Sequence, residues 1–237
     1  MTYIDLSSDW TNSTVTGFWS IPPPFLQAIQ PNTWYNPDDN RVYMWGGWAY
    51  NLTYYSYDLW SFTPWSNSSV VWELAPSPAL NGLSEGVIAP FGAAFVASNT
   101  TFYSLGGADA PNTNHYFPDG WQSLAVQGLV EYDFASGTWS NHSTTDATQS
   151  GYTIQAGAAL APNFGKTGFL ISIGGDIPTS QTYTFEASAQ LADMSVITLY
   201  DLESKAWYHQ KATGDIPPGR IEFCSVGAVS RENSFEM

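Results

Sequence analysis

The stretch FYSLGG at positions 102–107 joins an apolar, strand-like run to a glycine pair. The same arrangement occurs twice more, as VYMWGG at 42–47 and LISIGG at 170–175. A second landmark is a Tyr followed seven positions later by a Trp. In the second and third copies this Trp lies 33 residues after the first glycine of the pair. Two landmarks that keep one phase along the chain indicate a repeat protein. The landmark residues are Gly46, Gly47, Trp72, Gly106, Gly107, Tyr132, Trp139, Gly174, Gly175, Tyr200 and Trp207.

Each repeat unit reads as four strands. A run of small residues precedes each glycine pair, and a Tyr strand and then a Trp strand follow it. No 10-residue stretch has the apolar spacing of a helix. This order predicts an all-β fold, namely a β-propeller of four-stranded antiparallel blades. We expect the small residues where the inner strands converge on the axis, and each Trp over the seam to the next blade. The small-residue runs are 92–95, 157–160 and 226–229, with 32–35 as a looser copy.

The glycine pairs and the Tyr and Trp landmarks resemble the kelch repeat, and the resemblance covers essentially the whole chain. The units are longer than the roughly 50 residues of a kelch repeat, and the excess lies between the glycine pair and the Tyr strand. The long uncharged loops and the segment YIDLSSDWTNSTV at 3–15 are similar to the kelch propellers of fungal cell-surface proteins. That resemblance implies a galactose oxidase/kelch-type propeller in a secreted, glycosylated protein, often followed by a membrane anchor.

The landmarks keep a regular spacing along the chain, and this predicts that residues 1–237 form a single kelch propeller region. It predicts complete blades at 16–76, 77–145 and 146–212, with the end of one blade at 1–15 and the start of another at 213–237. About three complete blades and two partial ones form an incomplete ring, and we expect a fragment of a ring of six or seven blades. In the alternative, both ends combine in a composite blade that closes a four-bladed ring.

Composition and charge argue against several classes of protein. The chain has 21 acidic and 6 basic side chains, a net charge of −15, and 16% aromatic residues. So many aromatic residues exclude disorder, and so few bases argue against binding to nucleic acid or to anionic lipid. The single cysteine, Cys224, excludes an internal disulfide, and we expect it to be buried in an inner strand. The uncharged run 86–108 predicts two strands joined by a polar turn, not a membrane span.

Asn-x-Ser/Thr sequons predict N-glycosylation, and with it an extracellular or cell-surface location. No signal peptide is recognised at the start of the sequence. The sequons are at Asn12, Asn51, Asn67, Asn99 and Asn141.

The long loops after the glycine pairs are expected on one face, together with the connections between blades. They span 48–58, 108–127 and 176–193. Aromatic rings beside carboxylates suit either a glycan or the basic patch of a protein partner. In the alternative interpretation, these aromatic residues pack the loops onto the propeller. The candidate ligand-binding residues are Trp48, Tyr50, Asp109, His115, Asp119, Trp121, Asp176, Tyr183, Glu186 and Asp193.

Residues that could carry catalysis do not converge in the sequence. His142 and His209 follow Trp residues of different units, and only His115 lies in a long loop. The copper ligands of the galactose oxidase family, two Tyr and two His, are not reproduced. We therefore predict a non-catalytic module without cofactor or metal that binds a protein or a cell-wall glycan. Two alternatives stay open, a galactose-oxidase-like copper-radical or other glycan-active enzyme and an intracellular kelch scaffold.

Overall fold

The described part of the chain consists of β-strands joined by turns and loops. The structure, a computed structural model, describes residues 2–3, 19–20, 28–49, 59–64, 72–75, 87–111, 113, 123–183, 190–230 and 234–237. These residues include no helix, and so none that is long and apolar enough to cross a membrane.

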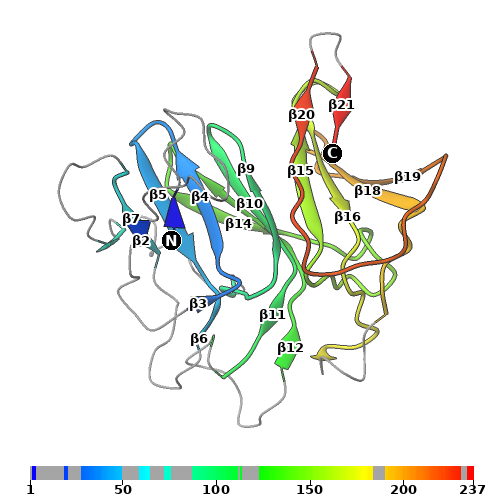
Figure 1. The fold of residues 1–237 in the computed structure, drawn as a ribbon, viewed down its shortest axis with the longest axis horizontal. Helices are drawn as coiled ribbons and strands as arrows, with labels where there is room; N and C mark the ends of the chain where they lie inside the picture. Colours follow the sequence, from blue (N-terminus) through cyan, green and yellow to red (C-terminus); the bar gives the residue numbers. More distant parts are fainter. Residues whose placement is uncertain are drawn as a thin grey trace, which may run out of the picture.

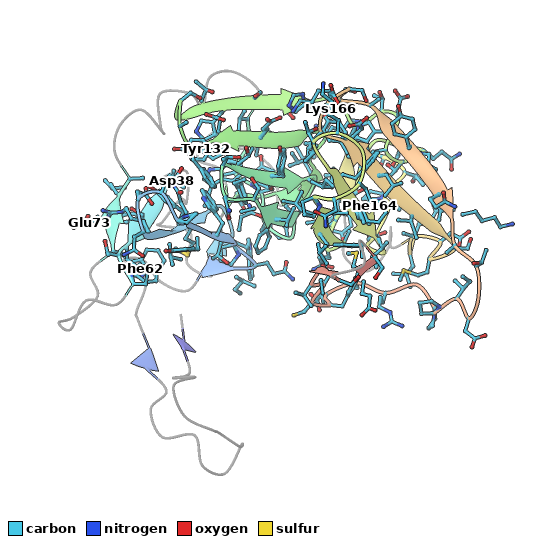
Figure 2. The ribbon with its side chains drawn as sticks, turned by 90° about the horizontal axis from the view of Figure 1, so that it is seen from above. Asp38, Phe62, Glu73, Tyr132, Phe164 and Lys166 are labelled. Atoms are coloured by element: carbon cyan, nitrogen blue, oxygen red, sulfur yellow. The ribbon has the colours of Figure 1, made fainter. Side chains whose placement is uncertain are left out.

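Three four-stranded antiparallel sheets, here called the first, second and third blade, follow one another side by side (Figures 1 and 2). The first contains β4 (Asn32–Asn36), β5 (Arg41–Trp45), β7 (Trp60–Phe62) and β8 (Glu73–Leu74). The second contains β9 (Ala94–Ala97), β10 (Thr101–Leu105), β13 (Leu129–Asp133) and β14 (Thr138–His142). The third contains β15 (Gly157–Ala161), β16 (Phe169–Ile173), β18 (Val196–Asp201) and β19 (Trp207–Lys211).

The four-stranded antiparallel sheets confirm the predicted fold class, and the described sheets do not close a ring. The blade boundaries proposed from the repeat phase stay predictions. Within the uncharged run, β9 and β10 form a hairpin with a polar turn, as expected.

The remaining described strands are short and form small sheets separate from the blades. Two hairpin pairs are β1 (Thr2–Tyr3) with β2 (Trp19–Ser20) and β20 (Ala228–Val229) with β21 (Phe235–Glu236). Two more small sheets form where long loops leave the blades: β3 (Ala28–Ile29) with β6 (Trp48–Ala49), and β11 (Ala108–Asp109), β12 (Ser123–Ala125) and β17 (Thr182–Tyr183) in that order.

The inner strands of neighbouring blades lie against one another, with β9 in contact with both β4 and β15. Small residues make this approach possible. Ala94 and Ala158 share one buried apolar cluster, and Gly157 of β15 is buried as well. The expected position of the small-residue strands at the centre of the fold therefore holds for the second and third blades.

The glycine pairs connect each blade to the next one. The second glycine of each pair donates its N–H to a carbonyl of the loop that enters the following blade, in the contacts Gly47–Pro90 (3.0 Å), Gly107–Thr153 (2.7 Å) and Gly175–Arg220 (2.9 Å). The first glycine has a left-handed backbone, and at Gly106 an added Cβ would lie 2.1 Å from the carbonyl oxygen of Thr153. Glycine is therefore required there both for conformation and for close backbone approach.

The landmark residues Trp139 and Trp207 pack toward the preceding blade, so the prediction that they cover the seam to the next blade is wrong. Trp139 stacks on Tyr132, which is opposite to it across β13 and β14, with ring centroids 4.4 Å apart. Trp139 also lies against Trp45 of the first blade. In the third blade, Trp207 donates its indole N–H to the carbonyl of Ser143, beyond the end of the second blade. In the second and third blades, the outer strand therefore turns its Trp side toward the preceding blade.

Candidate functional site

The end of the blades that carries the long loops is built from three equivalent strand pairings. Ile29 pairs with Trp48, Phe91 with Ala108, and Ile154 with Asp176. In each case the loop that enters a blade pairs with the start of a long loop. Figure 1 shows β6, β11 and β12 below the blades, at the opposite end from the β20–β21 hairpin. We call this end of the fold the loop face.

Long loops of two blades join in one sheet on the loop face. β12 belongs to the long loop of the second blade and β17 to that of the third, and they pair through Ser123 with Tyr183 and Leu124 with Thr182. This pairing fixes one loop against the other. The loop face is therefore a shared structure and not a set of separate loops.

Four predicted ligand-binding residues lie in or around the small apolar core beneath this sheet. The core contains Tyr183, and Trp48 packs against it from the first blade. Asp109 and Asp176 are also buried. Gln190 donates its backbone N–H to Asp176 Oδ1 (2.6 Å), which ties the end of the third long loop to its start. Burial, together with the charge of Asp176, raises the pKa of the Tyr183 phenol. These positions favour the interpretation that Trp48, Asp109, Asp176 and Tyr183 pack the loops.

Asp193 is the one described candidate with an exposed side chain. Its carboxylate accepts the backbone N–H of Ser195 (2.8 Å), and this bond lowers its pKa. It borders a pocket of about 550 Å³ that is lined by Ser172, Thr198 and His209 among others. The remaining candidates, Tyr50, His115, Asp119, Trp121 and Glu186, lie outside the described residues.

A set of residues that the sequence analysis did not single out meets between the blades. Gln30, Gly92 and Gln155 each precede the inner strand of a blade by two positions, and all three have a left-handed backbone. Glu222 has the same backbone conformation ahead of Cys224. Their main chains are joined, since Gly92 donates to Gln30 O (3.3 Å) and Gln155 donates to Gly92 O (2.6 Å).

Three of these side chains bond to one another. Gln155 Nε2 and Gln30 Nε2 both donate to Glu222 Oε1, at 2.9 and 3.0 Å. Gln155 Nε2 also lies 3.3 Å from Gln30 Oε1. Gly92 leaves room for the group, because an added Cβ would lie 3.0 Å from Gln30 Oε1. The network lines a pocket of about 330 Å³, here called the axial pocket, whose apolar walls include Phe95 and Phe223.

Cys224 also lines the axial pocket and is exposed, so the prediction that it is buried is wrong. The neighbouring Ser225 donates its hydroxyl to the carbonyl of Ala158 in the third blade (3.0 Å). The Cys224 side chain stays open to solvent beside this contact.

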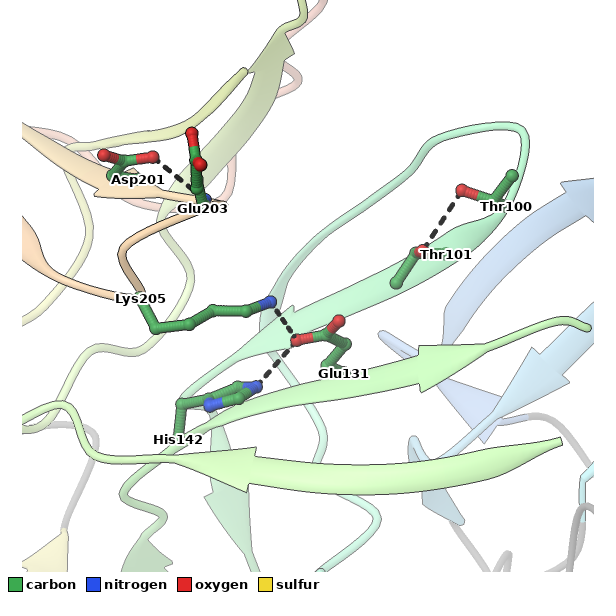
Figure 3. A network of polar contacts seen from close by, with 7 residues as sticks. All are labelled: Thr100, Thr101, Glu131, His142, Asp201, Glu203 and Lys205. Atoms are coloured by element: carbon green, nitrogen blue, oxygen red, sulfur yellow. Dashed lines mark hydrogen bonds and ion pairs between the residues drawn. The ribbon is translucent and has the colours of Figure 1, made fainter. Parts of the chain in front are cut away.

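A polar network lies between the second and third blades (Figure 3). Glu131 Oε2 accepts hydrogen bonds from His142 Nε2 (2.7 Å) and Lys205 Nζ (2.8 Å). The bond from His142 and then that from Lys205 lower the pKa of Glu131 to about 2, against the opposing effect of burial. No group of three His, Cys, Asp or Glu side chains able to hold a metal occurs in the described part of the chain. We interpret the Glu131 network as a contact between blades.

Antiparallel four-stranded sheets with adjoining inner strands define a β-propeller type of repeat protein. The chain is 28% identical over 144 residues to a kelch repeat-containing protein of Arthroderma benhamiae. This chain is thus a homologue of a kelch repeat-containing protein, which confirms the resemblance seen in the sequence. The alignment covers 50% of this chain and 20% of that protein, so the chain spans about a fifth of the length of the curated relative it matches. No protein-family model matches the chain.

Proposed function

We propose that this chain is a non-catalytic propeller module that binds a protein partner through the loop face and the axial pocket. The observation that carries the proposal is the convergence of Gln30, Gln155 and Glu222 on one pocket. They come from the entry to the first blade, the entry to the third blade and the segment that follows the third blade. Homology to a kelch repeat-containing protein supports an interaction module. Rigid strands that present loops at one end are a common platform for binding.

A protein partner is favoured over a glycan by the positions of the described aromatic residues. Stacking on a sugar needs an open ring face, but Tyr183 is buried and Trp48 packs against the loop core. The axial pocket offers hydrogen-bond acceptors and a carboxylate instead. A glycan ligand stays the alternative, and Trp121 and Tyr50 would then be its aromatic contacts.

We further propose that the module belongs to an exported, cell-surface protein. The five sequons and the strong excess of acidic residues support this location. The alternative of a copper-radical or other glycan-active enzyme predicts stoichiometric copper or glycan turnover in the purified protein. The alternative of an intracellular scaffold predicts unmodified sequons.

The face that binds a partner can be tested with two variants of equal charge. One neutralises acids assigned to the long loops (Asp119→Asn, Glu186→Gln, Asp193→Asn), and the other neutralises exposed acids elsewhere (Asp38→Asn, Glu203→Gln, Glu236→Gln). Each is used as bait in the source extract, and captured proteins are quantified by mass spectrometry. We expect a partner retained by the wild type and the second variant and depleted by the first, more strongly at low salt. Equal capture by both variants would overturn the assignment of the face.

A further inference from the structure

The axial pocket has more hydrogen-bond acceptors than its own donors satisfy. Gln155 is 6% exposed, and its Oε1 atom is buried without a hydrogen-bond partner in the described part of the chain. A buried amide oxygen without a partner costs about 1–3 kcal/mol. Because the atom is buried, a donor in the pocket reaches it when the Gln155 side chain turns slightly. Its Nε2 atom is already used on Gln30 and Glu222, which orients Oε1 away from those two acceptors.

The charge of the pocket lining is negative. Among the described residues, Glu222 is the only charged one that lines it, and the ion pairs between these residues do not include this carboxylate. Both amide donors bond to its Oε1 atom. Its Oε2 atom has no hydrogen-bond partner among the described residues and can accept a further hydrogen bond. A ligand that satisfies this lining therefore carries positive charge and several N–H donors.

The apolar walls of the axial pocket favour one kind of cationic group over another. Phe95 and Phe223 line the pocket beside alanine and glycine residues of the inner strands. A guanidinium group stacks on aromatic faces, is less strongly hydrated than an ammonium group and presents five N–H donors in a plane. Such a group can bond to Glu222 and Gln155 while its aliphatic stem lies along the apolar wall.

We infer that the axial pocket receives the guanidinium group of an arginine side chain from the protein partner. This inference rests on the proposed interaction function and names the chemistry that the pocket recognises. Glu222 and the Gln155 carbonyl accept from the guanidinium, and Gln30 positions Glu222. The backbone at Gln30, Gln155 and Glu222 is consistent with such a role, because left-handed conformations at residues with side chains are strained and cluster at binding sites.

The single cysteine provides a direct test, since Cys224 is exposed and lines the same pocket. The full chain is equilibrated, in a mild thiol buffer, with equal amounts of two disulfides. One delivers 2-guanidinoethanethiol, and the other delivers the neutral isostere 2-ureidoethanethiol. Intact mass spectrometry gives the ratio of the two adducts. The same ratio measured in concentrated urea provides the baseline for the unfolded chain.

We expect the folded wild type to favour the guanidino adduct by about fivefold over the unfolded baseline, the upper end of the range for a pair with an exposed carboxylate such as Glu222. The preference should be lost in Glu222→Gln and kept in Glu203→Gln, which removes an exposed carboxylate outside the pocket. A 2-aminoethanethiol adduct should be enriched less than the guanidino adduct. A wild-type ratio at the unfolded baseline, or an unchanged preference in Glu222→Gln, would overturn the inference. Because small probes are used, the result is independent of the capture of a partner by the loop face.

Discussion

Trp139 of the second blade lies against Trp45 of the first, with ring centroids 4.8 Å apart and ring planes inclined by 40°. Trp45 is fully buried, and Phe102 of the second blade meets its ring edge-on. Together with Tyr132, these aromatic residues form one apolar cluster that crosses the boundary between the two blades. The stability of the blade interface therefore depends on aromatic packing as well as on the backbone bonds of the glycine pairs.

Replacement of Trp139 by Ala should lower the free energy of unfolding by about 2–4 kcal/mol, because it removes a half-buried ring from the cluster. Urea unfolding followed by circular dichroism measures this loss. The control is Tyr35→Ala in β4, where the ring is 45% exposed, and the expected loss is below about 1 kcal/mol. Similar losses in the two variants would contradict the assignment of Trp139 to the interface.

Glu131 should make stability depend on acid pH. Its folded pKa of about 2 lies below its ordinary value of 4.5, so the ionised form stabilises the fold. This contribution is complete above about pH 4.5 and is lost as the pH falls toward 2. The shift corresponds to about 3 kcal/mol. Urea unfolding at pH 7, 4.5 and 3 should show a steeper decrease for the wild type than for Glu131→Gln.

The matched variant for that experiment is Glu203→Gln, whose carboxylate is exposed and bonded to Lys166. It should follow the wild-type pH profile, since exposed ion pairs contribute little. If Glu131→Gln and the wild type lost stability in parallel between pH 4.5 and 3, the bonds from His142 and Lys205 would not stabilise the interface.

The sequence predicted the four-stranded blades because each strand has its own signal. Small residues mark inner strands, as in the alanine-rich β15, and the Tyr–Trp spacing matches the register that places Tyr200 opposite Trp207. The direction in which a Trp packs was mispredicted. A repeat phase gives the order of strands along the chain, but it does not reveal which face of a blade meets the preceding one.

The candidate binding residues were harder to predict, for two physical reasons. Short strands inside the long loops bury Asp109 and Tyr183, and a loop without clear alternation gives no sign of this burial. The axial residues do not share one side chain at equivalent positions, since Gly92 and Glu222 stand where the other units have Gln30 and Gln155. Their common signal is positional, an apolar residue followed by a left-handed residue two places before the inner strand. That signal is visible only once the strands are aligned.

Replacement of Gly106 by Ala should destabilise the chain by about 3–5 kcal/mol. Its left-handed backbone disfavours a side chain, and the new Cβ would lie 2.1 Å from the carbonyl oxygen of Thr153. Gly214 separates these two effects, since it is also left-handed but has no atom within 4 Å of an added Cβ. Gly214→Ala should cost about 1 kcal/mol. Equal unfolding midpoints in urea for the two variants would show that the close approach to Thr153 adds nothing to the loss of stability.

The two described sequons should differ in glycan occupancy when the chain passes through a eukaryotic secretory pathway. Asn99 lies exposed in the turn between β9 and β10, where a bulky glycan can be accommodated. Asn141 is in β14, and its side-chain amide lies against Gly128, where an added Cβ would be 2.0 Å from its Oδ1 atom. We therefore expect Asn99 to be glycosylated almost completely and Asn141 only in part.

Peptide mass spectrometry before and after enzymatic deglycosylation measures the occupancy at both sites. Asn99→Gln should abolish the modification in its own peptide and leave the occupancy of Asn141 unchanged, since Asn99 lies in the turn between β9 and β10 and Asn141 in β14. Gly128→Ala should displace the Asn141 amide and raise the occupancy at that site in chains that still fold. A bare Asn99 beside a fully occupied Asn141 would contradict the idea that local packing controls access. Bare asparagines at both sites would instead support the intracellular alternative.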